Sequence, residues 1–346
     1  MVFSFKNLCG YLLRHPRFLT DTLADVFKLY RFKISRKKIA VITTGSGGIG
    51  DYLWIRNYMP LLRKDGYSVV LIAMSHWREF IECLDKENVD IVRYFESCQS
   101  PKKLETFFFK HFTADVFLNF RTASIGNYVK SKCEYSDIIF LGKPLFYEEK
   151  NNYVFSQYKS LPQGFKHKIP IIDPEHTLRS ILDSHKPYVV LVEGGNTQGK
   201  LSDEQLKSVS HSILDHHYDI FFNGDTERLK SLLDTDDQQH LIDGRILPFV
   251  QHIYAVANSA FVVTVNTSIY HFALQLQKPC VVISANEYET IKLDAPKQLI
   301  IFNKDLQIAY EKGNLQSHKK NKDINLDTIE SKRIVDAINE ISNTVI

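Results

Sequence analysis

The sequence of 346 residues predicts an α/β protein made of two Rossmann-like, doubly wound domains that face each other across a cleft. Three observations lead to this fold class. Apolar, β-branched runs of strand length alternate with helical patterns, which is typical of parallel sheets covered on both faces. Prolines and Gly164 interrupt the alternation once, between residues 142 and 172. The chain is also longer than a single hydrophobic core usually grows, about 250 to 300 residues.

The first half of the chain carries five strand patterns and four helical ones. The expected strands are 39–44, 68–73, 89–93, 115–119 and 137–140, and the expected helices are 51–65, 76–86, 101–111 and 122–131. The second half repeats the alternation. Its expected strands are 187–193, 218–223, 239–242, 260–265 and 279–284, and its expected helices are 174–184, 202–216, 225–233, 249–257, 267–277 and 325–345.

These patterns divide the chain into four segments: a helical N-terminal extension (1–38), an N-terminal domain (39–172), a C-terminal domain (173–325) and a closing helix (326–346). The extension is basic and amphipathic, because Lys and Arg interleave with aromatic and aliphatic residues at helical spacing. This pattern fits a helix pair packed on the first domain. It also fits a segment lying on an anionic membrane surface.

Composition narrows the class of protein. Hydrophobic residues make up 44% and charged residues 24%, as in ordinary globular proteins, and no apolar run reaches the length of a membrane span. The five cysteines are scattered without a Cys-x-x-Cys pair, which argues against a zinc site or a disulfide framework and favours the cytoplasm. No nucleic-acid-binding motif accompanies the basic extension, so we expect no nucleic-acid partner.

The first strand leads into a glycine-rich turn, Gly45-Ser46-Gly47-Gly48-Ile49-Gly50-Asp51. This spacing also occurs in dinucleotide-binding folds, so a nicotinamide-dependent oxidoreductase is one alternative. That fold needs an acidic residue at the end of the second strand, where this chain has Ser75-His76. Asp51 follows the last glycine. It either caps the helix or acts as a general base at the carboxyl end of the strand.

A second junction follows the strand at 260–265. Asn266, Thr267 and Ser268 are residues that cap helices, and they precede an apolar helix. A helix start offers free backbone N–H groups, for which a diphosphate is a natural ligand, although a capped core helix is the more common case. His271 lies one turn further on and is either a packed or surface histidine or a ligand of a phosphate or sugar.

Two further turns follow neighbouring strands. Lys200 ends the glycine-rich stretch that begins at Glu193, and it either neutralises a leaving phosphate or is a solvated loop lysine. Asn223 begins the turn Asn223-Gly224-Asp225. This turn either contacts a nucleoside or is ordinary turn and cap chemistry.

Together, these motifs resemble glycosyltransferase family 9, the bacterial heptosyltransferases of lipopolysaccharide assembly, between residues 39 and about 290. The stretch Gly47 to Trp54 is similar to the family's N-terminal loop, and VVTVNTSIYHFALQLQKPCVVIS, from Val262 to Ser284, is similar to its C-terminal block. The loop ending at Lys200 and the turn at Asn223 are also similar to family elements.

The resemblance implies the GT-B fold and inverting, metal-independent transfer of a sugar to a hydroxyl of a surface glycan or glycolipid. No cofactor is implied, and ADP-heptose is the first donor to test. Carried over by position, Asp51 is the catalytic base next to the acceptor-side loop of Gly47, Gly48 and Gly50. The donor ligands are Lys200, Asn223, Asn266, the amides of Thr267 and Ser268, and His271.

One departure from the family concerns its Asp-Ser-Gly motif, in which Asn266 replaces Asp and Ser268 replaces Gly. Asn keeps the hydrogen bonding but loses a negative charge near the sugar. A non-catalytic nucleotide-sugar-binding protein is therefore a second alternative. The pair Asp234-Thr235-Asp236 has the spacing of metal-dependent glycosyltransferases of another fold, but its polar surroundings predict a solvated loop.

Overall fold

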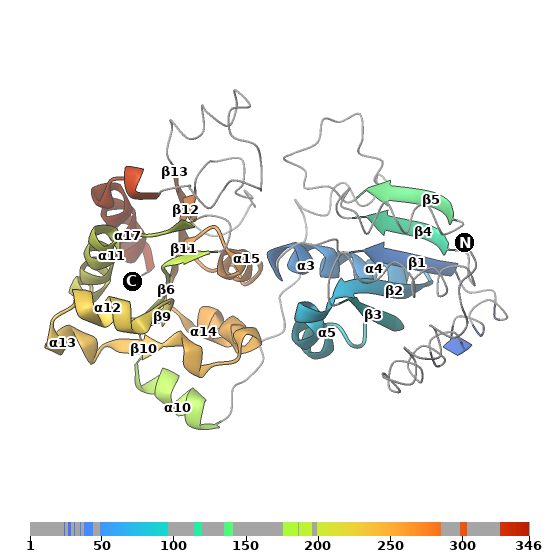
Figure 1. Cartoon of the computed structure of the whole chain (residues 1–346), viewed down its shortest axis with the longest axis horizontal. Coiled ribbons are helices and arrows are strands. Elements are labelled where there is room, and N and C mark those ends of the chain that lie inside the picture. Colours follow the sequence, from blue (N-terminus) through green and yellow to red (C-terminus); the bar gives the residue numbers. More distant parts are fainter. Residues whose placement is uncertain are drawn as a thin grey trace, which may run out of the picture. The chain divides into compact units, whose positions relative to one another are not determined.

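The computed structural model describes residues 38–43, 49–95, 114–119, 135–140, 176–185, 187–195, 199–284, 298–302 and 326–345, with a few single positions between 24 and 35. The chain divides into two compact units, Met1–Ser160 and Leu161–Ile346 (Figure 1). The division falls within the irregular stretch 142–172. The boundary expected at residue 172 and nearly all of the N-terminal extension lie outside the described residues.

The first unit contains one parallel sheet. Its strands are β1 (Lys38–Thr43), β2 (Tyr67–Met74), β3 (Ile91–Phe95), β4 (Ala114–Asn119) and β5 (Tyr135–Phe140). They lie in the order β3-β2-β1-β4-β5, and every neighbouring pair is parallel (Figure 1). This order is that of a Rossmann half, in which the chain builds outward from β1 first to one side and then to the other.

The helices described in the first unit are α3 (Ile49–Ile55), η1 (Arg56–Tyr58), α4 (Met59–Lys64), η2 (Ser75–Trp77) and α5 (Arg78–Leu84). The single helix expected over 51–65 is interrupted, because Pro60 stands at the start of α4 and cannot donate a backbone hydrogen bond. The helices expected over 101–111 and 122–131 lie outside the described residues.

The second unit contains a six-stranded parallel sheet. Its strands are β6 (Tyr188–Val192), β9 (Asp219–Asn223), β10 (Leu241–Asp243), β11 (Val262–Val265), β12 (Cys280–Ser284) and β13 (Gln298–Phe302). The order is β10-β9-β6-β11-β12-β13, the full Rossmann order (Figure 1). β6, β11 and β12 are buried along their whole length, which explains why their sequences are continuous apolar runs.

The helices described in the second unit are α10 (His176–Ser184), α11 (Asp203–Asp215), α12 (Thr226–Leu232), α13 (Thr235–Gln238), α14 (His252–Asn258), α15 (Ser268–Gln275) and α17 (Ser331–Val345), with short 3-10 turns η5 (Gly244–Ile246), η6 (Phe249–Gln251) and η9 (Leu326–Thr328). Ser202 and Gln205 form a capping box that begins α11. The Gln205 Nε2 atom also donates to the carbonyl oxygens of Leu326 and Ile329, at 2.8 and 2.6 Å. The closing helix itself packs on α11, since Oδ1 of Asn339 lies 2.9 Å from Nε2 of His216, the C-cap residue of α11.

Three further elements, all in the second unit, differ from the expectation. β13 was not predicted. The glycine-rich stretch after β6 forms a small antiparallel hairpin of β7 (Gly194–Gly195) and β8 (Gly199–Lys200). The Asp234-Thr235-Asp236 segment is not a loop, because Asp234 is the N-cap of α13. Within the described residues, no group of three His, Cys, Asp or Glu side chains is arranged to hold a metal ion. No described helix is long and apolar enough to span a membrane.

Candidate functional site

The candidate site lies at the carboxyl ends of the central strands of the second unit. From β6 the chain builds β9 and β10 on one side of the sheet, then returns to build β11, β12 and β13 on the other. Ligands of open α/β sheets bind at such a reversal of strand order, outside the carboxyl ends. Glu193 follows β6 at this point, and Asn266 follows β11.

The β7–β8 hairpin brings residues that are far apart in sequence to this reversal point. A Cβ atom on Gly194 would lie 2.8 Å from the backbone oxygen of Gly199, and one on Gly195 would lie 2.7 Å from Cγ2 of Thr267. Gly199 has a φ of +81°, which favours glycine. The glycines are therefore needed for the hairpin to close against Thr267, and the hairpin presents Lys200 at the same edge of the sheet.

Helix α15 begins at this edge with Thr267 as its N-cap residue. We expected the Thr267 side chain to cap the helix, but it makes no capping hydrogen bond. Its hydroxyl instead lies 3.2 Å from the hydroxyl of Thr264 in β11. The first turn of α15 is thus not capped by its own N-cap side chain, and the positive end of the helix dipole lies at the carboxyl edge.

His271, one turn into α15, is buried, and its ring centroid lies 5.3 Å from that of Tyr270. It is therefore not a surface histidine. Asn266 is half-buried, and its backbone N–H donates to Ile283 O of the neighbouring strand β12 at 3.0 Å. Ser268, the first residue of the helix, is also half-buried.

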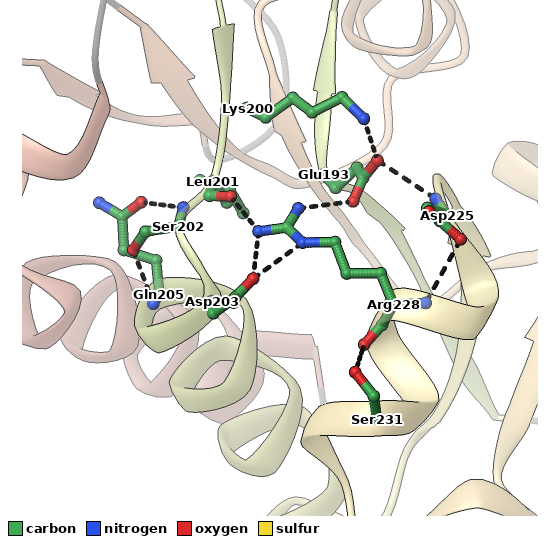
Figure 2. Close-up of polar contacts among 9 residues, drawn as sticks. All are labelled: Glu193, Lys200, Leu201, Ser202, Asp203, Gln205, Asp225, Arg228 and Ser231. Atoms are coloured by element: carbon green, nitrogen blue, oxygen red, sulfur yellow. Dashed lines mark hydrogen bonds and ion pairs between the residues drawn. The ribbon is translucent and has the colours of Figure 1, made fainter.

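A buried carboxylate, Glu193, organises the polar contacts beside the hairpin (Figure 2). Its Oε1 atom accepts a hydrogen bond from Nζ of Lys200 at 2.9 Å and another from the backbone N–H of Asp225 at 3.2 Å. Its Oε2 atom accepts from Nη1 of Arg228 at 3.0 Å. The Glu193 side chain is only 5% exposed, whereas that of Lys200 is 64% exposed. A buried anion therefore holds a cation that is still accessible to a ligand.

Arg228 joins this cluster to the start of α11. Its Nε and Nη2 atoms donate to Oδ1 of Asp203 at 2.8 and 2.6 Å, and Nη2 also donates to the carbonyl oxygen of Leu201 at 2.9 Å. Burial alone would lower the pKa of the guanidinium, but the hydrogen bond with Asp203 and the charge of Glu193 outweigh it and raise that pKa. Arg228 is therefore a permanent cation that fixes the hairpin, α11 and α12 to one another.

Asn223 ends β9, the strand next to β6. Its side-chain amide Nδ2 lies 3.3 Å from Nδ1 of His252, whose Nε2 lies 2.9 Å from the carbonyl oxygen of Gly244. The structure thus places five of the six sequence-predicted donor residues at or next to the carboxyl ends of β6, β9 and β11, and His271 lies one turn further along α15.

Sequence reasoning did not assign roles to Glu193, Arg228 and His252. The signal for Glu193 was a carboxylate directly after a continuous apolar strand, a position where an unpaired charge is costly. Arg228 lies 35 residues from Glu193 in sequence. Nothing in the chain near either residue indicates that they pair.

The first unit has a corresponding reversal between β1 and β4, and α3 follows β1 there. Asp51 lies in the first turn of α3, and Gly50 lies in the same helix. Gly47 and Gly48 fall outside the described residues, as does the side chain of Asp51. Asp51 therefore occupies the predicted helix start, and its role stays a prediction.

A buried polar cluster fixes α3 to the unit. Arg56 Nε and Nη2 donate to Oδ2 and Oδ1 of Asp85 at 2.8 and 3.0 Å, and the Tyr52 hydroxyl also donates to Oδ2 of Asp85. Burial and the neighbouring Asp85 carboxylate hold the pKa of Tyr52 well above its usual value. Tyr52 in α3 and Arg56, four residues later at the start of η1, therefore both hold the segment that carries Asp51 against Asp85.

The dinucleotide alternative lacks its main feature in this unit. β2 ends at Met74 and continues into η2, Ser75-His76-Trp77, so the position of the ribose-binding acid holds no carboxylate.

No protein-family model and no curated protein matches the sequence. Several solved structures share the fold. A family 9 glycosyl transferase from Veillonella parvula DSM 2008 has a TM-score of 0.64 at 12% identity, over 89% of this chain and 98% of that one. E. coli ADP-heptose lipopolysaccharide heptosyltransferase II has a TM-score of 0.59 at 14% identity, over 89% and 99%.

E. coli heptosyltransferase WaaC, solved with ADP, has a TM-score of 0.56 at 13% identity, again over 89% of this chain and 99% of that one. Because each similarity covers most of the chain and nearly all of the other protein, it includes both units. The predicted fold class, an α/β protein matching the GT-B glycosyltransferases, is confirmed.

Proposed function

We propose that this protein is a glycosyltransferase whose second unit binds a nucleoside-diphosphate sugar. The main support is the convergence, at one strand reversal, of an accessible cation, Lys200, with the start of α15. A diphosphate carries the charge that both features attract. The likeness of the fold to heptosyltransferases over most of the chain agrees with this reading.

In the proposed mechanism, the acceptor hydroxyl gives its proton to the carboxylate of Asp51. The hydroxyl oxygen attacks the anomeric carbon from the face opposite the diphosphate. The new glycosidic C–O bond forms while the bond from the anomeric carbon to the phosphate oxygen breaks, which inverts the anomeric centre. The bond electrons leave with the nucleoside diphosphate.

Lys200 and the backbone amides of Thr267 and Ser268 stabilise the charge that grows on the departing diphosphate. Such preorganised electrostatic stabilisation is usually the largest single contribution to a rate enhancement. These groups supply the positive charge that metal-dependent glycosyltransferases take from a bound cation, so we propose metal-independent transfer. His271 is buried in α15 and we assign it a further contact with the donor.

ADP-heptose is the first donor to test, and a hydroxyl of a lipopolysaccharide precursor or related surface glycolipid is the first acceptor. Asn266 stands where the resembled family has an aspartate, so the sugar side of the site carries one negative charge fewer. We place the reaction in the cytoplasm, with the basic extension contacting the anionic inner face of the membrane.

The decisive assay incubates the full-length protein with ADP-, GDP-, UDP-, CDP- and TDP-sugars and a glycolipid acceptor, and measures release of the nucleoside diphosphate. Asp51→Asn should abolish release while donor binding persists, because the amide cannot accept the proton. Asp65→Asn, an exposed aspartate of the same unit, is the matched control. Near-normal turnover in Asp51→Asn would remove Asp51 from the mechanism.

Asn266 also favours a second candidate, a nucleotide-sugar-binding protein without catalysis. The same assay separates the two functions. Donor binding without release of nucleoside diphosphate, with every acceptor and in the absence of one, would support the binding protein.

A further inference from the structure

His252 lies in a closed, largely aromatic environment at the start of α14. It is 4% exposed, and its ring meets those of Phe221 and Phe249 edge-on, with centroids 5.5 and 5.1 Å away. Burial lowers the pKa of the imidazole below its ordinary value, and the backbone carbonyls of Gly244 and Leu247 oppose this only in part. Near neutral pH the ring therefore carries one proton, on one of its two nitrogens.

The position of that proton follows from the partners of the ring. Nε2 lies 2.9 Å from the carbonyl oxygen of Gly244, and a carbonyl oxygen only accepts hydrogen bonds. Nε2 must therefore hold the proton, which leaves a lone pair on Nδ1. Gly244 is required here, because a Cβ atom at this position would lie 2.6 Å from the backbone oxygen of Phe222.

The tautomer of His252 in turn fixes the amide of Asn223. Nδ1 of the ring lies 3.3 Å from the Asn223 side chain, and a lone pair needs a donor, so the NH₂ group of the amide must face the ring. The other end of the amide, Oδ1, has no hydrogen-bond partner among the residues that the structure describes. Asn223 stands at the carboxyl end of β9, next to β6 and its Glu193–Lys200 cluster.

We propose that His252 is a positioning residue for nucleoside recognition: its tautomer locks the Asn223 amide so that Oδ1 accepts a hydrogen bond from a hydroxyl or amino group of the donor's nucleoside. This inference rests on the proposed function and adds to it the polarity of the nucleoside contact. An amide held in one orientation discriminates between nucleosides. A ligand that presents a hydrogen-bond acceptor to Oδ1 leaves both that acceptor and Oδ1 without a donor.

The first test reads the tautomer in the full-length protein. Two-dimensional ¹⁵N–¹H spectra of histidine-labelled protein at pH 7.5 should show a neutral ring protonated on Nε2, assigned by its disappearance in His252→Phe. A ring protonated on Nδ1, or a charged ring, would overturn the proposal without bearing on glycosyl transfer.

The second test compares the affinity of inorganic pyrophosphate with that of the tightest binder among ADP, GDP, CDP and UDP. Asn223→Leu and His252→Phe should each weaken the nucleoside diphosphate about three- to tenfold and leave pyrophosphate unchanged, since one hydrogen bond is lost. The double variant should be no weaker than Asn223→Leu, because both changes act through one amide. The 2′-deoxy analogue of the same nucleotide tests whether Oδ1 contacts the 2′-hydroxyl or a base amino group. If the contact is to the 2′-hydroxyl, Asn223→Leu should not weaken binding of the 2′-deoxy analogue. If the contact is to a base amino group, Asn223→Leu should weaken the analogue as much as the parent nucleotide.

Equal losses for pyrophosphate, or additive effects in the double variant, would refute the positioning role. Normal nucleoside-diphosphate binding in both single variants would refute it as well, and would leave the proposed function intact. A wild-type protein that binds none of ADP, GDP, UDP, CDP and TDP would refute the proposed function itself, and this inference with it.

Discussion

Replacing Arg228 by Met removes the guanidinium that joins the hairpin, α11 and α12 while keeping much of its aliphatic volume. Breaking a fully buried ion pair by deleting one partner costs about 3 to 5 kcal/mol. Here Glu193 is 5% exposed and Arg228 is 26% exposed, and Glu193 keeps Lys200 and the Asp225 amide as partners, so we reduce the cost to about 2 to 3 kcal/mol. The exposed contact with Asp203 adds little.

This loss should lower the melting temperature of the second unit, residues Leu161–Ile346, by about 4 to 12 °C, at about 2 to 4 °C per kcal/mol for a domain of this size. Calorimetry of the full chain measures it. Lys230→Met is the matched control on the same helix, because its exposed pair with Glu227 contributes less than about 0.5 kcal/mol. A drop for Arg228→Met no larger than for Lys230→Met would refute the reasoning.

A double-mutant cycle isolates the pair itself. Glu193→Gln removes the charge that Arg228 compensates, so the double variant should be more stable than the sum of the single losses predicts, by more than about 1 kcal/mol. Additive losses would mean that Arg228 acts through Leu201 and Asp203 and not through Glu193.

Three further outcomes follow from the structure. Arg56→Met should lower the free energy of unfolding of the first unit by about 3 kcal/mol, measured by urea unfolding, because the buried Asp85 carboxylate loses its cation. An effect no larger than that of Arg63→Met, which removes an exposed ion pair, would contradict this. The pKa of His252 is lower in the folded state than its unfolded value of 6.5. The contribution of the neutral ring to the free energy of unfolding is therefore complete above pH 6.5 and is lost as the pH falls through the pKa of the folded state. Unfolding free energies between pH 7.5 and 5 should therefore fall less steeply in His252→Gln than in wild type. Deleting residues 1–37, which precede β1, should reduce partition onto anionic liposomes, and unchanged partition would exclude the extension as a membrane contact.

The strands of both sheets other than β13 were predictable, because strands buried in parallel sheets read as continuous apolar runs, as in Val189 to Val192. Helix ends were less predictable. Pro60 splits the expected helix 51–65, and the Thr267 side chain turns to Thr264 where propensity alone favours capping. The first difference comes from a local helix breaker, and the second from a hydroxyl three residues earlier that competes with the backbone for the Thr267 side chain.

The composition of the candidate site was predictable in part. Lys200, Asn223 and Asn266 each follow a strand, and the topology brings those strand ends together. The partners of these residues were not predictable, because Glu193 meets Arg228, and Asn223 meets His252, only after the sheet has formed. Such pairings depend on distances between elements that one sequence does not specify.

Isothermal titration of the wild-type chain with ADP, GDP, UDP, CDP and TDP, beside Lys200→Met and the exposed control Lys207→Met, tests most directly whether the second unit holds a nucleoside diphosphate. We expect at least one of the five to bind the wild type and Lys207→Met alike. The affinity of Lys200→Met should be about tenfold lower, since a charge-assisted contact is lost. No binding by any of the five, or equal binding by all three proteins, would contradict the account.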